Sequence, residues 1–417
     1  MARGARPVGF GVTSETPFLP SRSFARRLGS SIRQLLGGLF RDPGVAALVF
    51  GGVLFYSFFY PWPYGGELVN RVPVLVVDQD QSALSRQIVR LVAAHPALAL
   101  RRVVVEPGAA REALWRNEVA GILVLPDGLA ADVRGGRHVA VALSGNGAYL
   151  LVDRVVLGAM AEVVGTVSAG ITVQRELART PEPAEARARA APLRADSVAW
   201  FNVREGYGSY VVPGVAVLVI QQTLWIGMAL MFGTWRQGRG PFPLDPGAAG
   251  FWGTQLAFAA VAWINSLYFF GWVLRWQDYP RAGSPTPLLL FSVLFALCLA
   301  ALGMALASLF RSRERSAQLL LVTTLPMLFL ADLSWPAVAL PGPLQTLRWL
   351  LPSSAAIPGF IALDQMGAGL ADVRRESLVL VALWAGGSLV AGWRWRRFAG
   401  DRRTETGEAM GRKDTGA

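Results

Sequence analysis

Residues 44–61, GVAALVFGGVLFYSFFYP, decide the fold of this chain. A helix needs about 20 predominantly apolar residues to cross the hydrocarbon core of a bilayer, and this stretch contains no charged side chain. Tyr60, Trp62 and Tyr64 lie at its end, as is typical of a membrane–water interface. More than forty residues precede the stretch and no A-x-A site follows it, so we predict a retained membrane helix and not a cleaved signal peptide.

Five further stretches have the same apolar character, and we therefore predict six membrane-spanning helices. They cover residues 44–61, 211–233, 251–274, 287–310, 317–332 and 377–395. Residues 349–363 (WLLPSSAAIPGFIAL) are also apolar, but Pro352 and Pro358 interrupt them. We expect a re-entrant segment over residues 333–363, because irregular backbone at membrane depth has to be buried in protein.

The composition excludes an ordinary soluble protein. Of 417 residues, 53% are hydrophobic and 16% are charged, and the mean hydropathy is +0.39, whereas soluble domains carry about 25% charged residues. The only lysine, Lys413, lies in Gly-Arg-Lys-Asp, so the chain lacks the Gly-Lys-Ser/Thr signature of a P-loop. One cysteine, Cys298, and two histidines, His95 and His138, give little support for a zinc or thiolate site.

The net charge of +12 comes almost entirely from arginine, and in a membrane protein arginine first indicates orientation. One side of the predicted spans carries Arg22, Arg26, Arg27, Arg33, Arg41, Arg236, Arg239, Arg311, Arg313, Arg315, Arg394, Arg396, Arg397, Arg402 and Arg403. The short connections on the other side carry only Arg275, Arg281, Arg348, Arg374 and Arg375. We therefore predict that both termini, residues 1–43 and the basic tail 396–417, are cytoplasmic.

The insert between the first two spans, residues 62–205, is long enough to form an extracytoplasmic domain. Its apolar runs predict strands at 72–77, 98–105, 119–125, 138–143 and 197–203, and the amphipathic stretches between them predict helices at 82–94, 108–116, 126–134 and 148–180. Alternation of this kind predicts a mostly parallel sheet covered by helices. In the turn Asp-Gln-Asp-Gln-Ser we expect Asp80 or Ser82 to cap the next helix, because Ala83 and Val89 stand where a calcium loop requires Gly and Glu.

Residues 22–41 have apolar side chains at helical spacing with arginines between them. This pattern predicts an amphipathic helix that lies at the membrane interface.

The order of one span, a large insert and five spans resembles the permease subunits of ABC-2-type exporters, in the multidrug-efflux-like branch with a large extracytoplasmic domain. Three segments carry the resemblance: VPVLVVDQDQSALSRQIVRLVAAHP (72–96), VAWFNVREGYGSYVVPGV (198–215) and LSWPAVALPGPLQTLRWLLPSSAAIPGF (333–360). The residues that match the family pattern are Pro213, Gly214, Leu333, Ser334, Pro336, Pro341 and Pro352.

The resemblance implies a permease subunit that moves a hydrophobic or amphipathic small molecule, drug-like or lipid-like, out across the bacterial cytoplasmic (inner) membrane. It also implies a dimer with a second copy or a paralogous permease, and a separate ABC ATPase subunit that binds the ATP and magnesium. A periplasmic adaptor is a further partner that the resemblance suggests, whereas nucleic acid is not expected. The chain itself is then neither an enzyme nor a cofactor-binding protein.

The sequence departs from the family where a Glu-rich cytoplasmic helix is expected after the second span. Residues 232–247 contain Pro241, Pro243 and Pro246 instead, which argue against a long helix. The remaining candidates for ATPase contact lie in residues 22–41 and in a loop at 311–316. They are Arg26, Arg27, Arg33, Arg311, Arg313 and Arg315.

Within the spans, amides and hydroxyls are the polar groups, and no carboxylate lies at mid-membrane. A proton-coupled transporter needs such a titratable relay. Gln222 and Asn265 are candidates for the substrate path, although hydrogen bonding between helices is the default role of such residues. The alternative function is a membrane-anchored extracytoplasmic adaptor without transport, which would need no polar path. An extracytoplasmic or intramembrane enzyme would need a paired acid and base, and the sequence offers no such pair.

Overall fold

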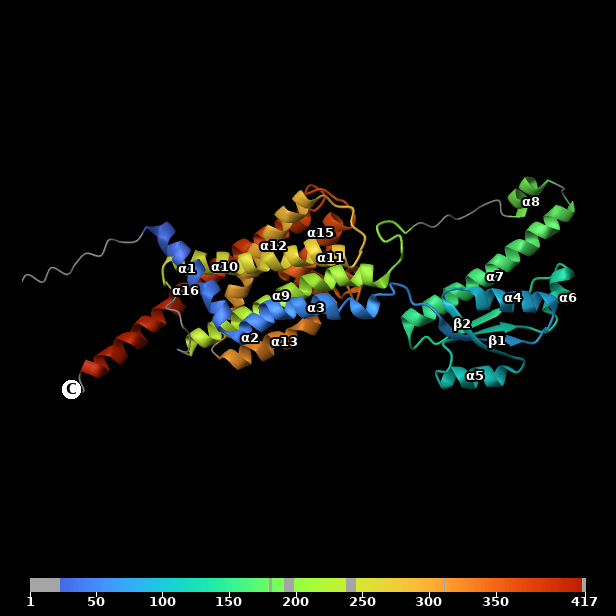
Figure 1. Ribbon diagram of the computed structural model, residues 1–417, viewed down its shortest axis with the longest axis horizontal. Coiled ribbons are helices and arrows are strands. Elements are labelled where there is room, and N and C mark those ends of the chain that lie inside the picture. The colour runs from blue at the N-terminus through green and yellow to red at the C-terminus, as the bar shows by residue number, and fades with distance from the viewer. Residues whose placement is uncertain (1–22, 180–181, 191–198, 238–244, 311, 415–417) are drawn as a thin grey trace, which may run out of the picture. The chain divides into compact units, whose positions relative to one another are not determined.

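The computed structural model describes residues 23–179, 182–190, 199–237, 245–310 and 312–414. The chain forms two compact units, one from Met1–Trp62 with Ser209–Ala417 and the other from Pro63–Gly208. We call them the membrane unit and the α/β unit, and we describe each by itself (Figure 1). The predicted insert, residues 62–205, corresponds to the second of these.

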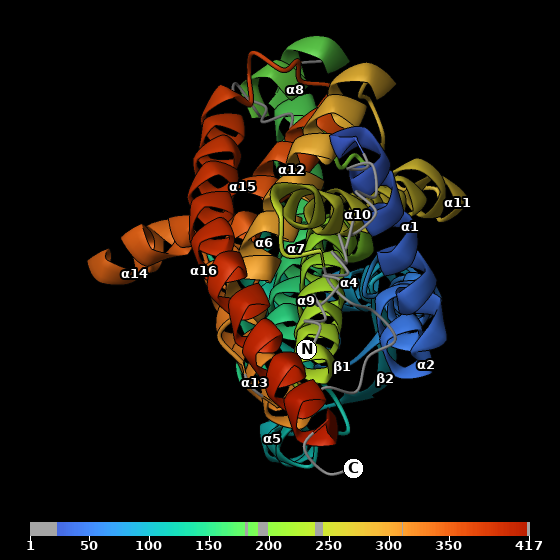
Figure 2. The same cartoon turned by 90° about the vertical axis from the view of Figure 1, so that its left-hand side faces the viewer.

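The regular elements of the membrane unit, among the described residues, are all helices. Its elements are α1 (Phe24–Arg41), α2 (Pro43–Ala46), the π-helix η1 (Ala47–Gly52), α3 (Val53–Phe59), α9 (Tyr207–Arg236), α10 (Ala248–Ser266), the π-helix η3 (Leu267–Val273), α11 (Leu274–Trp276), α12 (Pro285–Ala307), α13 (Arg313–Leu330), η4 (Ala337–Ala339), α14 (Gly342–Leu347), η5 (Arg348–Leu350), α15 (Pro352–Asp364) and α16 (Arg374–Asp414). The most apolar helix, α12, packs against both α10 and α16 (Figure 2).

Six helices among the described residues are long and apolar enough to cross a membrane: Pro43–Tyr64, Leu150–Arg179, Tyr207–Arg236, Ala248–Trp276, Pro285–Ala307 and Arg374–Arg397. Five of them overlap predicted spans. The predicted fifth span, residues 317–332, corresponds instead to α13, an 18-residue helix whose first turn holds Arg313, Glu314 and Arg315. The remaining apolar helix, α7 (Leu150–Arg179), belongs to the α/β unit.

The predicted interfacial helix forms as α1. Leu35 and Leu39 are buried, and Ser31 and Gly38 lie on the same buried face. This face packs against α10. The arginines of α1 lie outside the buried face, so the amphipathic pattern marks a helix that packs on the membrane unit through its apolar side.

The predicted re-entrant region is a series of short helices. Pro341 precedes α14, and Pro352 occupies the first turn of α15, where its missing N–H has no helical partner to lose. Pro358 lies inside α15, whose 13 residues are too few to cross a bilayer. Most of α15 is buried in the membrane unit, as backbone at that depth requires.

The α/β unit is built on a four-stranded sheet in the order β2-β1-β3-β4. Its strands are β1 (Val72–Asp78), β2 (Leu98–Val104), β3 (Gly121–Leu125) and β4 (Ala142–Gly145). The first three are parallel, with Val72 opposite Leu98 and Val74 opposite Gly121, and β4 is antiparallel to β3. The prediction of a mostly parallel sheet therefore agrees with the structure.

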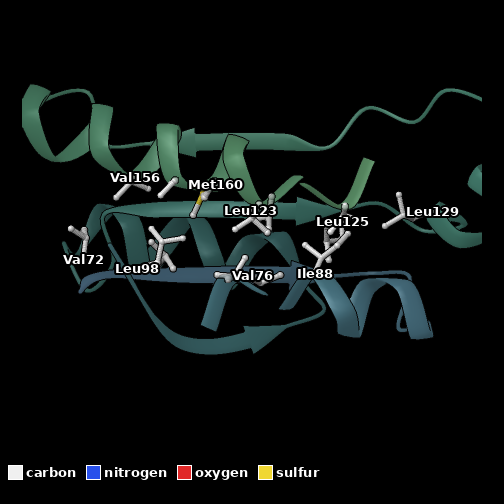
Figure 3. Packing of buried hydrophobic residues seen from close by; sticks show 14 residues of the cluster. Val72, Val76, Ile88, Leu98, Leu123, Leu125, Leu129, Val156 and Met160 are labelled. Carbon is white, nitrogen blue, oxygen red and sulfur yellow. The ribbon is translucent and has the colours of Figure 1, made fainter. Parts of the chain in front are cut away.

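Helices cover both faces of this sheet. α4 (Ala83–Ala94), α6 (Leu129–Arg134) and α7 (Leu150–Arg179) pack on one face, and α5 (Pro107–Trp115) packs on the other. The chain also forms η2 (Trp62–Tyr64) at the boundary of the unit and α8 (Pro183–Ala190), which packs on α7. Val74 and Val76 of β1 point to the face covered by α4 and α7, where Met160 joins them (Figure 3). Leu75 and Val77 point to the opposite face, under α5. The side chains of β1 alternate between two cores, so nearly the whole strand is apolar.

Two sequence predictions for the α/β unit were wrong in detail. The fourth strand lies at Ala142–Gly145 and not at 138–143, because residues 138–141 pair with no described strand. Residues 199–203 form no strand, and residues 197–198 lie outside the described part of the chain. This strand was predicted from apolar character alone. Aromatic residues such as Trp200 and Phe201 also occur in irregular segments near a membrane, so apolar character does not specify a strand.

Candidate functional site: polar contacts inside the membrane unit

Two neighbouring glutamines of α9 connect it to two other helices. The Gln222 Nε2 donates to the Leu320 carbonyl at 3.0 Å and to the Thr324 Oγ1 at 2.7 Å, both on α13. The Gln221 Oε1 accepts from the Ser353 N–H, in the first turn of α15, at 3.0 Å. All of the Gln221 side chain is buried and Gln222 is 5% exposed. The pair therefore holds α13 and α15 against α9.

One acceptor of this group is left over. The Gln222 Oε1 is buried and has no hydrogen-bond partner among the described residues. A buried carbonyl without a partner costs about 1–3 kcal/mol. The Gln255 Oε1 of α10 is in the same state, so an unpartnered carbonyl is not unique to the candidate Gln222.

Asn265, the second candidate, is buried in α10 and donates from Nδ2 to the Val49 carbonyl at 3.1 Å. Val49 lies in the π-helix η1, and the π-helix η3 begins two residues after Asn265. A π-helical turn disturbs the regular backbone pairing of an α-helix, and such turns are frequent at functional sites. The structure thus gives Asn265 the default role of an interhelical hydrogen bond, at a place where both partner helices are irregular.

The arginine candidates divide into two groups. Arg27 forms a two-point ion pair with Asp245, with Nε–Oδ2 and Nη2–Oδ1 distances of 3.0 and 2.7 Å. Arg313 forms a similar pair with Asp42, with Nη2–Oδ1 at 2.9 Å, and also donates to the Thr234 Oγ1 at 2.6 Å. Each of these two arginines therefore connects two segments of the membrane unit that are distant in the sequence.

Three of the other arginine candidates lie on the surface of the described protein. Arg26, Arg33 and Arg315 are exposed, and Arg311 lies outside the described residues. The predicted loop at 311–316 is wrong from residue 313 onward, because α13 begins at Arg313 with Ser312 as its N-terminal flanking residue. Glu314 in that first turn is favourable to a helix start.

The two carboxylates in these pairs have lowered pKa values. The hydrogen bond from Arg313 is the main cause for Asp42, and that from Arg27 is the main cause for Asp245. Both acids also accept backbone N–H groups, Val45 for Asp42 and Gly247 for Asp245. Each carboxylate therefore joins an arginine to the start of a helix, α2 in the first case and α10 in the second.

Two of the residues that carry the family resemblance, Gly214 and Leu333, lie next to each other. Pro213 lies inside α9, and a Cβ on the next residue, Gly214, would collide with the Leu333 side chain. The Tyr210 hydroxyl donates to the Leu333 carbonyl at 2.9 Å. Glycine at 214 thus lets the segment after α13 pack on α9. Ser334 and Pro336 follow in that segment and are exposed, and Pro241 and Pro243 lie outside the described residues.

A family model described as ABC-2 family transporter protein matches residues 44–239 and 247–394. The match includes the membrane helices and the inserted α/β unit. The chain belongs to this family. None of the curated proteins compared matches it. As an ABC-2 permease it is a multi-pass membrane protein and a component of membrane transport.

The permease contains two ion pairs, each with one buried partner, that the sequence did not reveal. Asp364, at the end of α15, is 2% exposed and accepts from the Arg281 Nε at 2.9 Å. Arg348, 7% exposed, lies 3.7 Å from Asp332 and stacks on Trp349 with 5.1 Å from Cζ to the ring centroid. Arg281 and Arg348 entered the sequence argument only as charges that indicate orientation.

The partners of these arginines are far apart along the chain, 83 residues in the case of Arg281 and Asp364. No local spacing therefore marked them. The pairs fix both ends of the segment that follows α13 in the permease. The sequence offered one signal for these pairs, namely the carboxylates Asp332 and Asp364. An acidic residue next to a predicted span needs a cationic partner.

Proposed function

We propose that this ABC-2 permease is the membrane subunit of an ATP-driven exporter for a hydrophobic or amphipathic small molecule. Energy would come from an ABC ATPase on a separate polypeptide, since this chain has no P-loop, and the working unit would contain a second copy or a paralogous permease. The observation that supports this most directly is the family match together with uncharged spans, because the path then suits a cargo without strong charge.

The cytoplasmic side offers a physical route for coupling. We expect the exposed Arg26, Arg33 and Arg315 to contact the ATPase, whereas the Arg313–Asp42 pair ties the start of α13 to the start of α2. A displacement of α1 would then be transmitted to α13 through the Asp42–Arg313 pair. From α13 it would be transmitted to α9 through the hydrogen bonds of Gln222. ATP-driven closure shifts the equilibrium between two arrangements of the spans only if it favours one of them by a difference in binding energy.

The first experiment is extraction of a C-terminally tagged permease from its native membrane in a gentle detergent, with identification of the proteins that co-purify. The proposal expects an ABC ATPase at near-equal stoichiometry. A second permease or a periplasmic adaptor in the same fraction would define the rest of the complex. Recovery of extracytoplasmic proteins alone, with no ATPase even after crosslinking, would overturn the proposal in favour of a membrane-anchored adaptor.

A charge-reversal set tests the contact surface. We expect Arg26→Glu, Arg33→Glu and Arg315→Glu together to release the ATPase. The matched control reverses three exposed arginines of the α/β unit, Arg90, Arg101 and Arg111, and should retain it. Equal retention by both sets would show that these cytoplasmic arginines do not contact the ATPase.

A further inference from the structure

A groove lies beside α7 in the α/β unit. One part has a volume of about 640 Å³ and the adjoining part about 240 Å³, and both are lined by Leu84, Val133, Ile171 and Arg175. The larger part falls within the range of about 300–1,000 Å³ that is usual for small-molecule sites. Its walls come from α4, α6 and the second half of α7.

The topology of the sheet explains why the groove opens here. The chain leaves β1 for β2 through α4 on one face, and leaves β2 for β3 through α5 on the other, so the direction of winding reverses between β1 and β3. Ligands of doubly wound sheets bind beyond the carboxyl ends of the strands at such a point. Ser82 and Ala83, which follow β1, and Ala130, which follows β3, line the groove.

The floor of the groove is apolar. Ile88, Leu129 and Val167 are buried members of the core below it, and Leu129 lies beyond the end of β3 (Figure 3). Leu84 and Ile171 are only partly buried and pack on the same core. The hydrophobic core thus continues to a surface that the unit's own described residues leave open, and an alkyl chain there would remove that surface from water.

The mouth of the groove is cationic. Arg134, Arg137 and Arg175 line it, and none of its lining residues in the described part of the chain is a carboxylate. Arg137 pairs with Asp132, but no described carboxylate pairs with Arg134 or Arg175. Arg134 donates from Nε to the Ala130 carbonyl, and Arg175 from Nη2 to the Val133 carbonyl. Each contact positions a guanidinium whose other N–H groups remain for an anion.

We propose that this groove binds a single-chain anionic amphiphile, with its alkyl chain along Leu84, Val133 and Ile171 and its carboxylate held by Arg134 and Arg175. The site lies wholly within the α/β unit and does not depend on the transport function. It defines a ligand class for the insert, a long-chain carboxylate.

The test uses the full-length permease in nanodiscs of phosphatidylcholine, which contain neither detergent nor anionic lipid. The probe is hexadecanoate with a photoreactive diazirine in its chain, and labelled peptides are mapped by mass spectrometry. We expect strong labelling within residues 129–141 and 164–178, which unlabelled hexadecanoate displaces. Labelling of the membrane helices by probe dissolved in the bilayer gives an internal reference. The matching alcohol should label the groove about tenfold less, since it lacks the charge-assisted hydrogen bonds.

Two kinds of variant test the binding of the carboxylate and of the alkyl chain separately. Arg134→Gln with Arg175→Gln removes the cations, and Ala178→Trp fills the mouth from an exposed position that lines it. We expect each to reduce groove labelling about tenfold relative to the internal reference. Arg154→Gln and Ala169→Trp are the matched controls, because both residues are exposed on α7 and neither lines the groove.

Circular dichroism of each variant verifies that it is folded. Labelling of the α/β unit that falls outside the groove, or that is equal in the wild type and both variants, would overturn the proposal. Equal labelling by the acid and the alcohol would overturn the role of the arginines.

Discussion

Asp42 is a single residue on which two helix starts depend. It caps α2 by accepting the Val45 N–H at 3.2 Å, and it pairs with Arg313 at the start of α13. The two side chains are 24% and 26% exposed, so water screens this pair less than a fully exposed one. We therefore expect it to be energetically significant, in contrast to the exposed pairs of the α/β unit.

Asp42→Asn and Arg313→Gln form a double-mutant cycle. We expect a coupling of about 1–2 kcal/mol in the free energy of unfolding, measured in mixed micelles, because each substitution removes the same charge-assisted hydrogen bonds. Arg315→Gln is the control, since Arg315 lies in the same first turn of α13 and is exposed. Strict additivity of the two single substitutions would contradict the expected coupling.

The pH dependence of this coupling follows from the lowered pKa of Asp42. In the unfolded chain the carboxyl binds a proton at higher pH than in the folded chain. The stabilisation is complete above the ordinary pKa, about 3.9, and is lost as the pH falls through the lowered value. Repeating the cycle between about pH 7 and pH 3 should show the coupling decline only below the ordinary value. A coupling that rose on acidification would contradict this sign.

Gln222 permits a separation of structure from transport. Gln222→Leu removes its hydrogen bonds to α13, and Thr324→Val removes one of them but leaves the unpartnered Gln222 Oε1 in place. Each should lower stability by about 1 kcal/mol. If the Oε1 contacts cargo, Gln222→Leu will reduce efflux of a fluorescent lipophilic dye more than Thr324→Val. Equal efflux at equal stability would assign Gln222 to helix packing alone.

At the scale of elements, the contact between α9 and α13 is set by a glycine. A Cβ on Gly233 would lie 2.7 Å from both the Cα and the N of Arg313. These are backbone atoms, so no rotation of a side chain can make room. The close approach in turn places Thr234 within hydrogen-bond distance of the Arg313 guanidinium. Glycine at 233 is therefore required by packing and not by backbone conformation.

Gly233→Ala should destabilise the permease by about 1–3 kcal/mol, the usual cost of overpacking. Gly386→Ala is the matched control, because a Cβ at that position of α16 meets no atom within 4 Å. Alanine is the better helix former, so the control should be neutral or slightly stabilising. Thermal unfolding in the same detergent measures both, and equal midpoints for the two variants would contradict the contact.

At the scale of the molecule, the two units are compact separately, and the buried charges among the described residues of the membrane unit, Arg348 and Asp364, lie in the segment that follows α13. The arginine distribution predicts that the cytoplasm faces Arg315 and that the α/β unit faces outward. The native cysteine, Cys298, is fully buried in α12 and leaves the surface free of thiols. Introduced cysteines can therefore report the orientation directly.

Ala109→Cys in the α/β unit and Arg315→Cys at the start of α13 are both at exposed positions. We expect a membrane-impermeant maleimide to label Ala109→Cys in intact cells and Arg315→Cys only after permeabilisation. The wild type, with Cys298 alone, is the control and should not react under native conditions. Labelling of Arg315→Cys in intact cells would reverse the predicted orientation.

The sequence by itself determined the features that depend on composition and local order. Twenty apolar residues predict a membrane helix, alternating patterns predict the α/β insert, and Ser82 caps α4 as expected, accepting the Leu84 and Ser85 N–H groups at 3.1 Å. The same reasoning is less secure for α7, which is apolar enough to cross a membrane, yet packs on the sheet through Val156 and Met160. Its packing on the sheet assigns α7 to the α/β unit.

Only the tertiary structure decided which arginines form ion pairs within the chain and which are exposed. Arg27 and Arg26 are neighbours of the same type, but Arg27 meets Asp245, 218 residues away. The groove beside α7 was equally hidden, because its walls come from three separate helices. Pairing at long range depends on how helices pack in space, and hydrophobic periodicity specifies which face of a helix is buried without specifying what that face meets.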